Sequence, residues 1–457
     1  MGPPKNRQAT NRPTQEVSTQ RLQCNALDYK HVVTSFLTVD QQILLLRRSE
    51  KVGTHRHRWS AVSGHLENNE APLKRALTEI REEVGLQEEQ LTLIRPGEAL
   101  RAYDKENDTV WIVHPFLFQT KSKAIQLDWE NTAYAWINPK DISSYETVPK
   151  LKEVYDRVRR DLNATPQYLT PSLRAIDDVA NDRIHGASFL GRRAVELLST
   201  TSTTSKAQDQ DELFSDLLMV GLRLRKAQPA MAIVWNLVGQ FLELVDRERK
   251  DNGSLAEFKN SCTDIAGAVL QTAIEAAEDA SRNAARLLPQ TGHILTHSYS
   301  SIVQRSIELG VKGWKNLEVY ATESYPGMEG KEFAKALVGL GVPVKLIPDA
   351  SVDSIISNVD VVIVGADSVL RDGSLIHKTG TNHIATTAHK SGIPFHSTCE
   401  TLKFSARDFL GETPEFNKSL FDLTPPEHIS SFTTEIGKLE PGRINERLKE
   451  FVKKIYP

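Results

Sequence analysis

The spacing of apolar residues divides the chain into three stretches. Between about residues 28 and 141, short β-branched runs such as HVVTSFLTV and VWIVHPFLF flank one amphipathic helical segment, which predicts a mixed sheet with helices. From 150 to 286, apolar residues recur every three or four positions, as in MAIVWNLVGQFLELV, so a helical bundle is expected. After Leu288, strand-like runs such as HILTHS and DVVIVGAD alternate with helical segments, which predicts a doubly wound parallel sheet.

These patterns predict an α/β multidomain chain. We expect a first domain of α/β/α sandwich type at 27–150, a helical subdomain at 151–286 and a Rossmann-like subdomain at 287–457. Within the helical stretch, the segment STTSTTSKAQDQDE at 199–212 predicts a mobile loop, because such a composition cannot pack into a core. Residues 1–26 are polar with several basic residues, which predicts a disordered tail, with a mitochondrial presequence as the alternative.

Composition narrows the classes of function. The 457 residues carry a net charge of −3, which gives no long-range attraction for nucleic acid or anionic lipid. Cys24, Cys262 and Cys399 are too few and too scattered for a disulfide framework or a zinc site, so we expect a reducing, cytoplasmic compartment. Cys399 is expected to pack in a strand rather than to react. No run approaches the roughly 20 apolar residues of a membrane span.

The stretch GHLENNEAPLKRALTEIREEVGL concentrates carboxylates at helical spacing after a glycine turn. Pro72 suits the first position of a helix and Gly85 suits its end. Over that helix, Glu79, Glu82 and Glu83 fall within an arc of roughly 100°. Like charges at this spacing repel unless a cation lies between them, and carboxylate oxygens are ligands for Mg²⁺ or Mn²⁺, which bridge to phosphate. The bland alternative is an acidic, solvated surface helix.

The wider pattern resembles the signature box of the Nudix hydrolases. Gly64 is followed after five residues by Glu70, and after seven more by TEIREEVGL. The resemblance implies a site for a metal ion and a pyrophosphate formed by Gly64, Glu70, Glu79, Glu82 and Glu83. Thr78 stands where the family has an Arg that orients the catalytic helix, which puts the rate in doubt more than metal binding. We expect one of three nearby cations to supply charge to Glu70 instead, namely Lys74, Arg75 or Arg81.

The residues just before this box are candidate substrate contacts. Arg56 and Arg58 carry guanidinium groups suited to phosphate, and Trp59 offers a ring for a base, although a place for Trp59 in the core is the better-supported interpretation. The resemblance implies hydrolysis of a nucleoside diphosphate derivative with Mg²⁺ or Mn²⁺ as cofactor. The sequence does not choose the general base.

The markers ILTHSYSSIV, TESYPGMEGKEFAKAL, VGADSVLRDGSLIHKTGTNHIA and FDLTPPEHISSFTTEIG occur in order after residue 290. Together they resemble the family that joins the alpha, beta and delta subunits of translation initiation factor 2B to the ribose-1,5-bisphosphate and methylthioribose-1-phosphate isomerases, over about residues 170–457. The resemblance implies a homo-oligomer built through the doubly wound region, a sugar-phosphate ligand, and contacts with the translation initiation machinery.

Ligands of open parallel sheets bind at the carboxyl ends of the strands, and four polar residues are expected there: Ser298, Glu323, Asp367 and Glu400. The isomerases use a Cys where this chain has Ser298, and they share Asp367. A serine hydroxyl without a base is a far weaker nucleophile than a thiol. An Arg-Gly-Ala of the isomerases is replaced here by His185, Gly186 and Ala187. Four further matching residues are expected to hold phosphate at a helix start: Lys378, Gly380, Thr381 and Asn382.

We therefore expect a Nudix hydrolase fused to a region that binds a sugar phosphate or nucleotide without catalysis. One alternative is a regulatory or scaffold protein of translation initiation with a vestigial Nudix site. The other is a bifunctional hydrolase and sugar-phosphate isomerase, which would depend on Asp367.

Overall fold

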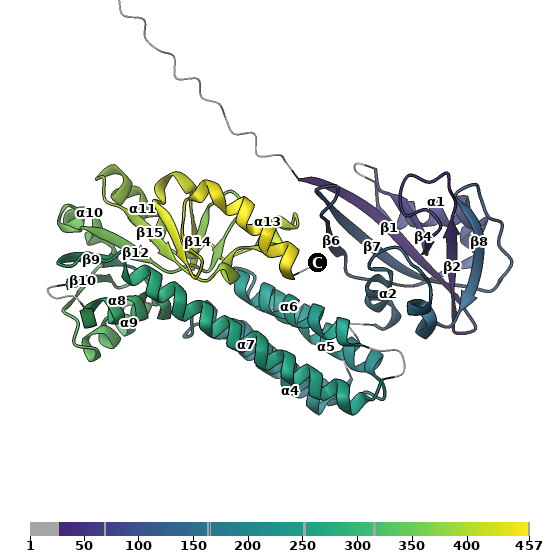
Figure 1. Cartoon of the computed structure of the whole chain (residues 1–457), viewed down its shortest axis with the longest axis horizontal. Coiled ribbons are helices and arrows are strands. Elements are labelled where there is room, and N and C mark those ends of the chain that lie inside the picture. The colour runs from purple at the N-terminus through teal and green to yellow at the C-terminus, as the bar shows by residue number, and fades with distance from the viewer. Residues whose placement is uncertain are drawn as a thin grey trace, which may run out of the picture.

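The computed structural model contains a domain rich in strands, a set of long helices and a second α/β region, shown from purple to yellow in Figure 1. It describes residues 27–67, 70–161, 164, 166–249, 253–313 and 317–455. The tail expected at 1–26 lies outside these residues. No helix within the described part of the chain is long and apolar enough to cross a membrane.

The N-terminal domain is an eight-stranded mixed sheet with a helix on each face. Its strands are β1 (Asp28–Val39), β2 (Gln42–Arg48), β3 (Trp59–Ser60), β4 (Val62–His65), β5 (Leu91–Pro96), β6 (Leu100–Asp104), β7 (Thr109–Thr120) and β8 (Asn131–Ile137). Only the pair β1 and β7 is parallel. Side chains alternate along a strand, so Val33 and Leu37 pack with α1 (Pro72–Val84), whereas Phe36 packs with α2 (Leu151–Arg159) on the opposite face.

Helix α2 lies beyond the domain end expected at residue 150, and it packs on the first sheet. Leu151, Val154 and Val158 of α2 are buried in the same core as Phe36 and Ile43. Their spacing of three and four residues predicts a helix correctly, but that periodicity is the same whichever neighbour the helix packs against. Two 3₁₀ turns complete this domain, η1 (Glu88–Gln90) and η2 (Pro139–Ser144).

A bundle of long helices follows, as expected. It comprises η3 (Gln167–Leu169), α3 (Thr170–Asn181), α4 (Ala187–Thr204), α5 (Gln210–Ala227), α6 (Ala232–Glu248) and α7 (Leu255–Ala285), and their apolar faces share one core. Most of the segment 199–212, for which a mobile loop is expected, is helical, because α4 continues to Thr204 and α5 begins at Gln210. Buried Thr201 hydrogen-bonds to Ser172 at 2.9 Å, and its hydroxyl also reaches the Leu197 carbonyl. Tertiary contacts thus satisfy hydroxyls that the composition alone assigns to solvent.

The C-terminal region has the expected alternation of strands and helices. A seven-stranded sheet runs in the order β11-β10-β9-β12-β15-β17-β18, and its pairs are parallel except β17 with β18. Its strands are β9 (Gly292–Thr296), β10 (Leu317–Thr322), β11 (Val344–Ile347), β12 (Val361–Val364), β15 (Phe395–Thr398), β17 (Ser431–Thr434) and β18 (Gly437–Leu439). A small antiparallel sheet comprises β13 (Ser368–Val369), β14 (Leu375–Lys378) and β16 (Phe421–Thr424).

Helices separate most of these strands. They are α8 (Ser301–Gly313), α9 (Glu329–Gly339), α10 (Val352–Ile355), α11 (Thr381–Lys390), α12 (Ala406–Phe409) and α13 (Ile444–Ile455). Five 3₁₀ turns lie beside them: η4 (Asp349–Ser351), η5 (Ile356–Asn358), η6 (Thr401–Lys403), η7 (Pro426–His428) and η8 (Pro441–Arg443). Cys399, just after β15, is fully buried and burial raises the pKa of its thiol, so it is packed as expected.

The N-terminal domain and the C-terminal region share one hydrophobic core. Tyr103, Val110 and Ile112 of the β6–β7 hairpin pack with Phe409 and other residues of the C-terminal region. The ring of Tyr103 meets that of Phe409 edge-on at 5.3 Å between centroids. In Figure 1 this hairpin lies close to α13. The apolar contact fixes the N-terminal domain against the C-terminal region.

Candidate active site

Helix α1 has the bounds expected from its sequence. Pro72 occupies its first turn, and Gly85 follows it with a φ of 73°, where its N–H bonds to the Arg81 carbonyl at 3.1 Å. Ala76, Ile80 and Val84 dock on the sheet. Because the glutamates flank this apolar stripe, Glu79 and Glu83 are buried at its margins, whereas Glu82 is exposed.

Glu79 lies directly against the backbone of Gly64. A Cβ built on Gly64 would stand 1.6 Å from Oε1 of Glu79, so only glycine leaves room for this carboxyl group. Arg75, one turn earlier on α1, forms an ion pair with Oε1. Burial raises the pKa of Glu79 to about 7, although Arg75 acts in the opposite direction. The expected proximity of Gly64 and Glu79 is therefore present.

Glu83 is held from two sides. It accepts the Ser63 N–H at 2.8 Å on one oxygen and the Asn131 Nδ2–H at 2.8 Å on the other. Burial raises the pKa of Glu83 to about 8, against the effect of both hydrogen bonds. Asn131 is a site residue that the sequence reasoning missed, since it lies 48 positions from Glu83. The one local signal is the polar run DWEN before β8.

Glu130, beside Asn131, brings a fourth carboxyl group to the site. Burial, followed by the charge of Asp128, raises the pKa of Glu130, and Glu82 acts in the same direction. Glu130 in turn raises the pKa of both Glu79 and Glu83. The carboxylates of α1 and of the residue before β8 repel one another, and a bound cation would relieve this repulsion.

The donor set fits a hard divalent cation. Glu79, Glu82 and Glu83 supply oxygen ligands, and the Gly64 backbone adjoins them. Yet within the described residues no group of three or more His, Cys, Asp or Glu side chains is arranged to hold a metal ion. Glu83 is turned towards Ser63 and Asn131, and Glu79 is bound to Arg75. The side chains needed are present, but they are engaged with protein partners.

The other predicted residues of this site lie farther from the carboxyl cluster. Glu70 forms no ion pair in the described part of the chain, so the expected pairing with a nearby cation is absent and Arg75 binds Glu79 instead. Arg56 bonds to the Val52 carbonyl at 3.0 Å, and Arg58 pairs with Glu146 at 3.4 Å. The Thr78 hydroxyl, where the family has Arg, returns to the Lys74 carbonyl at 3.1 Å.

Trp59 is half-buried and packs against the core that α2 shares with the sheet. Its ring meets Tyr145 edge-on at 5.2 Å and packs among the apolar residues beneath α2.

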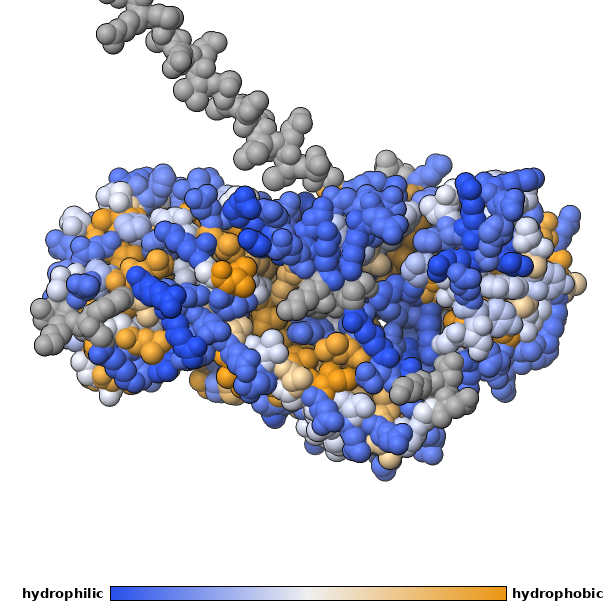
Figure 2. Space-filling view, in the orientation of Figure 1, coloured by the Kyte–Doolittle hydropathy of each residue, from blue (hydrophilic) through white to orange (hydrophobic). Residues whose placement is uncertain are grey.

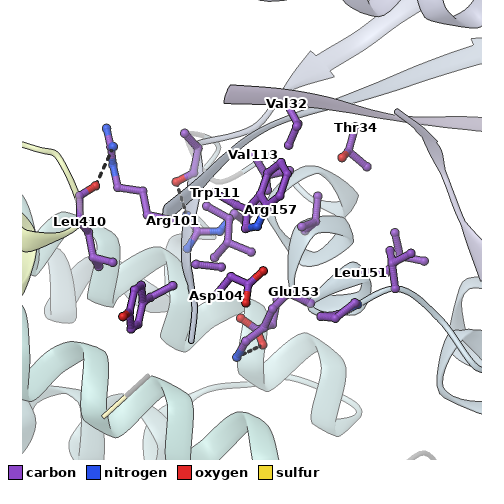
Figure 3. Close-up of a pocket in the computed structure, with 18 of the residues that line it drawn as sticks. Val32, Thr34, Arg101, Asp104, Trp111, Val113, Leu151, Glu153, Arg157 and Leu410 are labelled. Carbon is purple, nitrogen blue, oxygen red and sulfur yellow. Dashed lines mark hydrogen bonds and ion pairs between the residues drawn. The ribbon is translucent and has the colours of Figure 1, made fainter. Parts of the chain in front are cut away.

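A cavity of about 1650 Å³ opens from these carboxylates along the sheet towards α2 and the bundle. Gly64, Glu79, Glu82 and Glu130 line one end, and Arg58 also lines it. The opposite wall comes from α5, α6 and the segment after α12, including Trp235 and Leu410. Figure 3 shows Arg101 of the N-terminal domain reaching the Leu410 carbonyl, a hydrogen bond of 3.1 Å. In Figure 2 the surface is hollowed between the bundle and the N-terminal domain.

The second candidate site lies at the carboxyl ends of β9 and β10. Ser298 is buried with a φ of 66°, and its N–H bonds to the Ser324 hydroxyl at 2.7 Å. His297 is engaged by Thr322 at 2.6 Å and by the Thr379 carbonyl at 2.9 Å. Neither contact gives Ser298 a base, which agrees with the expectation that serine is a weak replacement for cysteine here.

The N–H groups at the helix start near Gly380 are already bound by a carboxylate of the protein itself, that of Asp422. Asp422 accepts the N–H of Gly380 at 2.8 Å and that of Asn382 at 3.1 Å. The Thr381 hydroxyl bonds to the Lys378 carbonyl at 2.6 Å. The phosphate expected at this helix start would therefore have to displace Asp422, which lies 40 residues or more from these groups in sequence. Burial raises the pKa of Asp422 to about 6.

Asp367 lies in a polar, buried environment. Burial raises its pKa, while the charges of Lys378 and Lys403 oppose that shift. Four buried oxygens near these groups lack a hydrogen-bond partner in the described chain: Asp367 Oδ2, Thr379 Oγ1, Asn382 Oδ1 and Asp422 Oδ1. Such orphaned groups are typical of places where a ligand or water binds.

The remaining predicted residues of the second site are more dispersed. A Cβ on Gly186 would lie 3.7 Å from the Tyr299 carbonyl, so this segment adjoins the Ser298 turn, and Ala187 begins α4 beside it. His185 turns outward to Asp182 at 2.7 Å. Glu323 pairs with Lys331 at 3.3 Å, and Glu400 binds the Ser188 hydroxyl at 2.7 Å.

Comparison with known proteins matches both halves of the chain. Residues 183–418 match the Initiation factor 2 subunit family, and residues 29–158 match the NUDIX domain. The second range includes α2, in agreement with its packing.

Among relatives, the chain is 28% identical over 282 residues to a Pyrococcus furiosus protein named translation initiation factor eIF-2B subunit 2-like, covering 59% of this chain and 97% of that protein. It is 27% identical over 285 residues to the ribose 1,5-bisphosphate isomerase of Methanocaldococcus jannaschii, covering 58% and 90%. Among solved structures, the translation initiation factor eIF-2B of Pyrococcus horikoshii OT3 aligns with a TM-score of 0.53 at 26% identity, over 61% of this chain and 99% of that one.

Proposed function

Because the chain belongs to the Initiation factor 2 subunit family and carries a NUDIX domain ahead of that region, we propose that it is a metal-dependent pyrophosphohydrolase acting on a nucleoside diphosphate derivative. The observation that carries the proposal is the convergence of Glu79, Glu82 and Glu130 with Gly64 at one end of the interdomain cavity. Carboxylates that repel one another are unfavourable at the wall of a cavity unless a ligand or cation binds there. A helix with a purely structural role would therefore not be expected to place them beside a cavity large enough for a nucleotide.

In this proposal Glu79, Glu82 and Glu83, with the Gly64 backbone, hold Mg²⁺ or Mn²⁺, and Glu70 completes the site. The metal ion, when bound, neutralises charge on the diphosphate and lowers the pKa of water. Burial favours the protonated forms of Glu79 and Glu83, so both carboxyl groups release protons on binding the cation. Ser63 and Asn131 fix the orientation of Glu83 throughout.

Water attacks one phosphorus of the diphosphate, and the bond from that phosphorus to the bridging oxygen breaks, which yields two monophosphates. Glu82 and Glu130 both face the cavity that water enters, so we assign to one of them the uptake of the proton from the attacking water. Of the predicted substrate contacts Arg56, Arg58 and Trp59, Arg58 is the one that lines the cavity.

The test is phosphate release, after phosphatase treatment, from nucleoside diphosphate sugars, ADP-ribose, dinucleotides and nucleoside triphosphates with Mg²⁺ or Mn²⁺. Wild type is compared with Glu82→Gln and with Glu89→Gln, which changes an exposed glutamate beyond the helix. Turnover lost only in Glu82→Gln supports the hydrolase and names its substrate class. Absence of turnover on every substrate refutes it.

The ion pair between Arg75 and Glu79 favours one alternative. It occupies the oxygen that the metal ion requires, and Thr78 lacks the charge that orients α1 in the family. Under this alternative the chain is a regulatory or scaffold protein of translation initiation with a vestigial Nudix site. Association with initiation factor 2 in pull-downs, without metal-dependent turnover, would support it.

For the C-terminal region we propose a sugar-phosphate or nucleotide site around Asp367, Lys378 and Asn382. The orphaned oxygens there support a ligand, whereas Ser298 without a base and the capping of Gly380 by Asp422 argue against isomerase chemistry. Calorimetric titration with ribose phosphates tests the ligand. Isomerase product that disappears in Asp367→Asn would instead establish a bifunctional enzyme.

We also propose that the chain acts in the cytoplasm as a homo-oligomer built through the C-terminal region. A solved complex of similar fold from C. thermophilum is a tetramer of beta and delta subunits of eIF2B, at a TM-score of 0.53 and 22% identity. Analytical ultracentrifugation measures the oligomer number, and a monomer at micromolar concentration would refute this part.

A further inference from the structure

The interdomain cavity has a second end, away from the carboxylates. Helices α1 and α2 pack on opposite faces of the sheet, and the cavity runs from the glutamates of α1 to the inner side of α2. At this second end three residues come from different parts of the chain: Arg157 from α2, Arg225 from α5 and Trp235 from α6. Arg157 is among the side chains labelled in Figure 3.

Arg157 is a half-buried cation, and among the described residues no carboxylate pairs with it. Its hydrogen bond goes to the Ala99 carbonyl at 3.3 Å, and it makes no ion pair in the part of the chain that the structure describes. Burial, followed by the charge of Arg225, lowers its pKa to about 10. A guanidinium group that is partly withdrawn from water is stabilised by an anion that approaches it.

The nearest acidic groups do not fill that role. Three carboxylates act on Arg157 at longer range, and each is paired with another cation: Glu153 with Lys150 at 2.7 Å, Glu98 with Lys226, and Asp156 with Arg249 at 2.5 Å. An anionic ligand in the cavity could therefore pair with the positive charge of Arg157.

Trp235 provides a second and independent observation. Its indole Nε1–H is buried and has no acceptor among the described residues. The guanidinium of Arg225 stacks on its ring, with Cζ at 4.5 Å from the ring centroid. Stacking holds a guanidinium plane in place, an arrangement common in phosphate recognition. Arg157 and Trp235 thus offer donors to one region of the cavity, and Arg225 adds a positive charge beside them.

We propose that this end of the cavity binds a further phosphate group of the substrate, remote from the diphosphate that is cleaved, through Arg157 and the Nε1–H of Trp235, with the charge of Arg225 beside them. The inference rests on the proposed hydrolase. It adds that the bundle of the initiation-factor-like region forms one wall of the substrate site. The preferred substrates are nucleoside diphosphate derivatives that carry an additional phosphomonoester.

Matched substrate pairs that differ by one phosphate test the proposal. The pairs are NADPH with NADH and coenzyme A with dephospho-coenzyme A. For the full-length wild type we expect kcat/KM to be at least about tenfold higher for the phosphate-bearing member of one pair, since one charge-assisted recognition contributes about a factor of ten. Arg157→Gln is expected to bring this ratio close to one, and Arg157→Lys to restore part of it.

The control is Arg193→Gln, an arginine of α4 whose side chain is 52% exposed and which lies outside the cavity. It should keep the ratio of wild type. Hydrolysis of both members of every pair at equal kcat/KM, or an unchanged ratio in Arg157→Gln, would overturn the phosphate site while leaving the hydrolase intact.

If no substrate is hydrolysed, the affinity of the protein for the same compounds tests the phosphate site. Calorimetric titration of the metal-free protein with the same pairs should show the phosphate-bearing member binding about tenfold more tightly, with the difference lost in Arg157→Gln. Equal binding of both members would refute the site independently of any catalytic result. If Arg157→Gln does not fold, Trp235→Phe, which removes the Nε1–H and keeps an aromatic ring, takes its place in both experiments.

Discussion

Replacement of Gly64 by alanine should lower the activity of this protein while leaving its free energy of unfolding almost unchanged. The new Cβ would stand 1.6 Å from Oε1 of Glu79, whereas real Cβ atoms essentially never come closer than 3.0 Å, so the carboxyl group must retreat by at least about 1.4 Å. A misplacement of about 1 Å in a catalytic group can cost a factor of roughly 100 in rate. We therefore expect Gly64→Ala to lower kcat/KM about 100-fold, equivalent to about 2.7 kcal/mol of transition-state stabilisation.

The folded state should suffer much less. The displaced atoms belong to the end of a flexible side chain, and alanine restricts the unfolded chain by about 0.4–1 kcal/mol relative to glycine, which offsets part of the cost. We expect the free energy of unfolding to change by less than about 1 kcal/mol. We also expect Mg²⁺ to raise the Tm of wild type and to raise that of Gly64→Ala less, because the increase reports metal affinity.

Gly53→Ala is the matched control. A Cβ on Gly53 would meet nothing within 4 Å, so both its kcat/KM and its Tm should equal those of wild type. Hydrolysis and urea unfolding are measured on the three proteins in parallel. If Gly64→Ala retains the kcat/KM of wild type, the contact between Gly64 and Glu79 has no part in catalysis and the assignment of the site is wrong.

Two further predictions concern other buried groups. Asn131→Ala removes the hydrogen bond to Glu83 and should lower kcat/KM about 10- to 100-fold, as outer-shell changes around metal ligands do, with a matching loss in the Mg²⁺-induced rise of Tm; an unchanged Mg²⁺ response would contradict this role. Burial lowers the pKa of His396 to about 4, so its contribution to stability is complete above about pH 6.5 and is lost as the pH falls towards 4. Urea unfolding at pH 7 and pH 5 should show that His396→Asn is less sensitive to acid by about 2 kcal/mol, and equal sensitivity would show that His396 is accessible to protons when folded.

Local patterns in the sequence predicted local structure well. Pro72 and Gly85 bound α1 as expected, because the conformational limits of proline and the freedom of glycine act within one turn. The strands after Leu288 were predicted by their buried, β-branched runs. The helical periodicity of Leu151, Val154 and Val158 was also correct, but it gave no information on the partner of this helix, which is the first sheet.

Groups that meet across the sequence were not predictable. Asn131 reaches Glu83, and Asp422 caps Gly380, over separations of 48 and 42 residues. A polar residue before a strand looks the same whether it binds a catalytic carboxylate or solvent. The resemblance to known families placed the carboxylates on one helix, but only the packing shows that Arg75 neutralises Glu79.

The shared core of the β6–β7 hairpin and the C-terminal region bears on how this chain can evolve. Loss of the N-terminal domain would leave Phe409 and its apolar neighbours facing water, and transfer of that domain to another protein would uncover Tyr103, Val110 and Ile112. Either event creates a surface prone to aggregation. We therefore expect the two domains to be inherited together, with new substrate preferences arising by substitution within their common cavity.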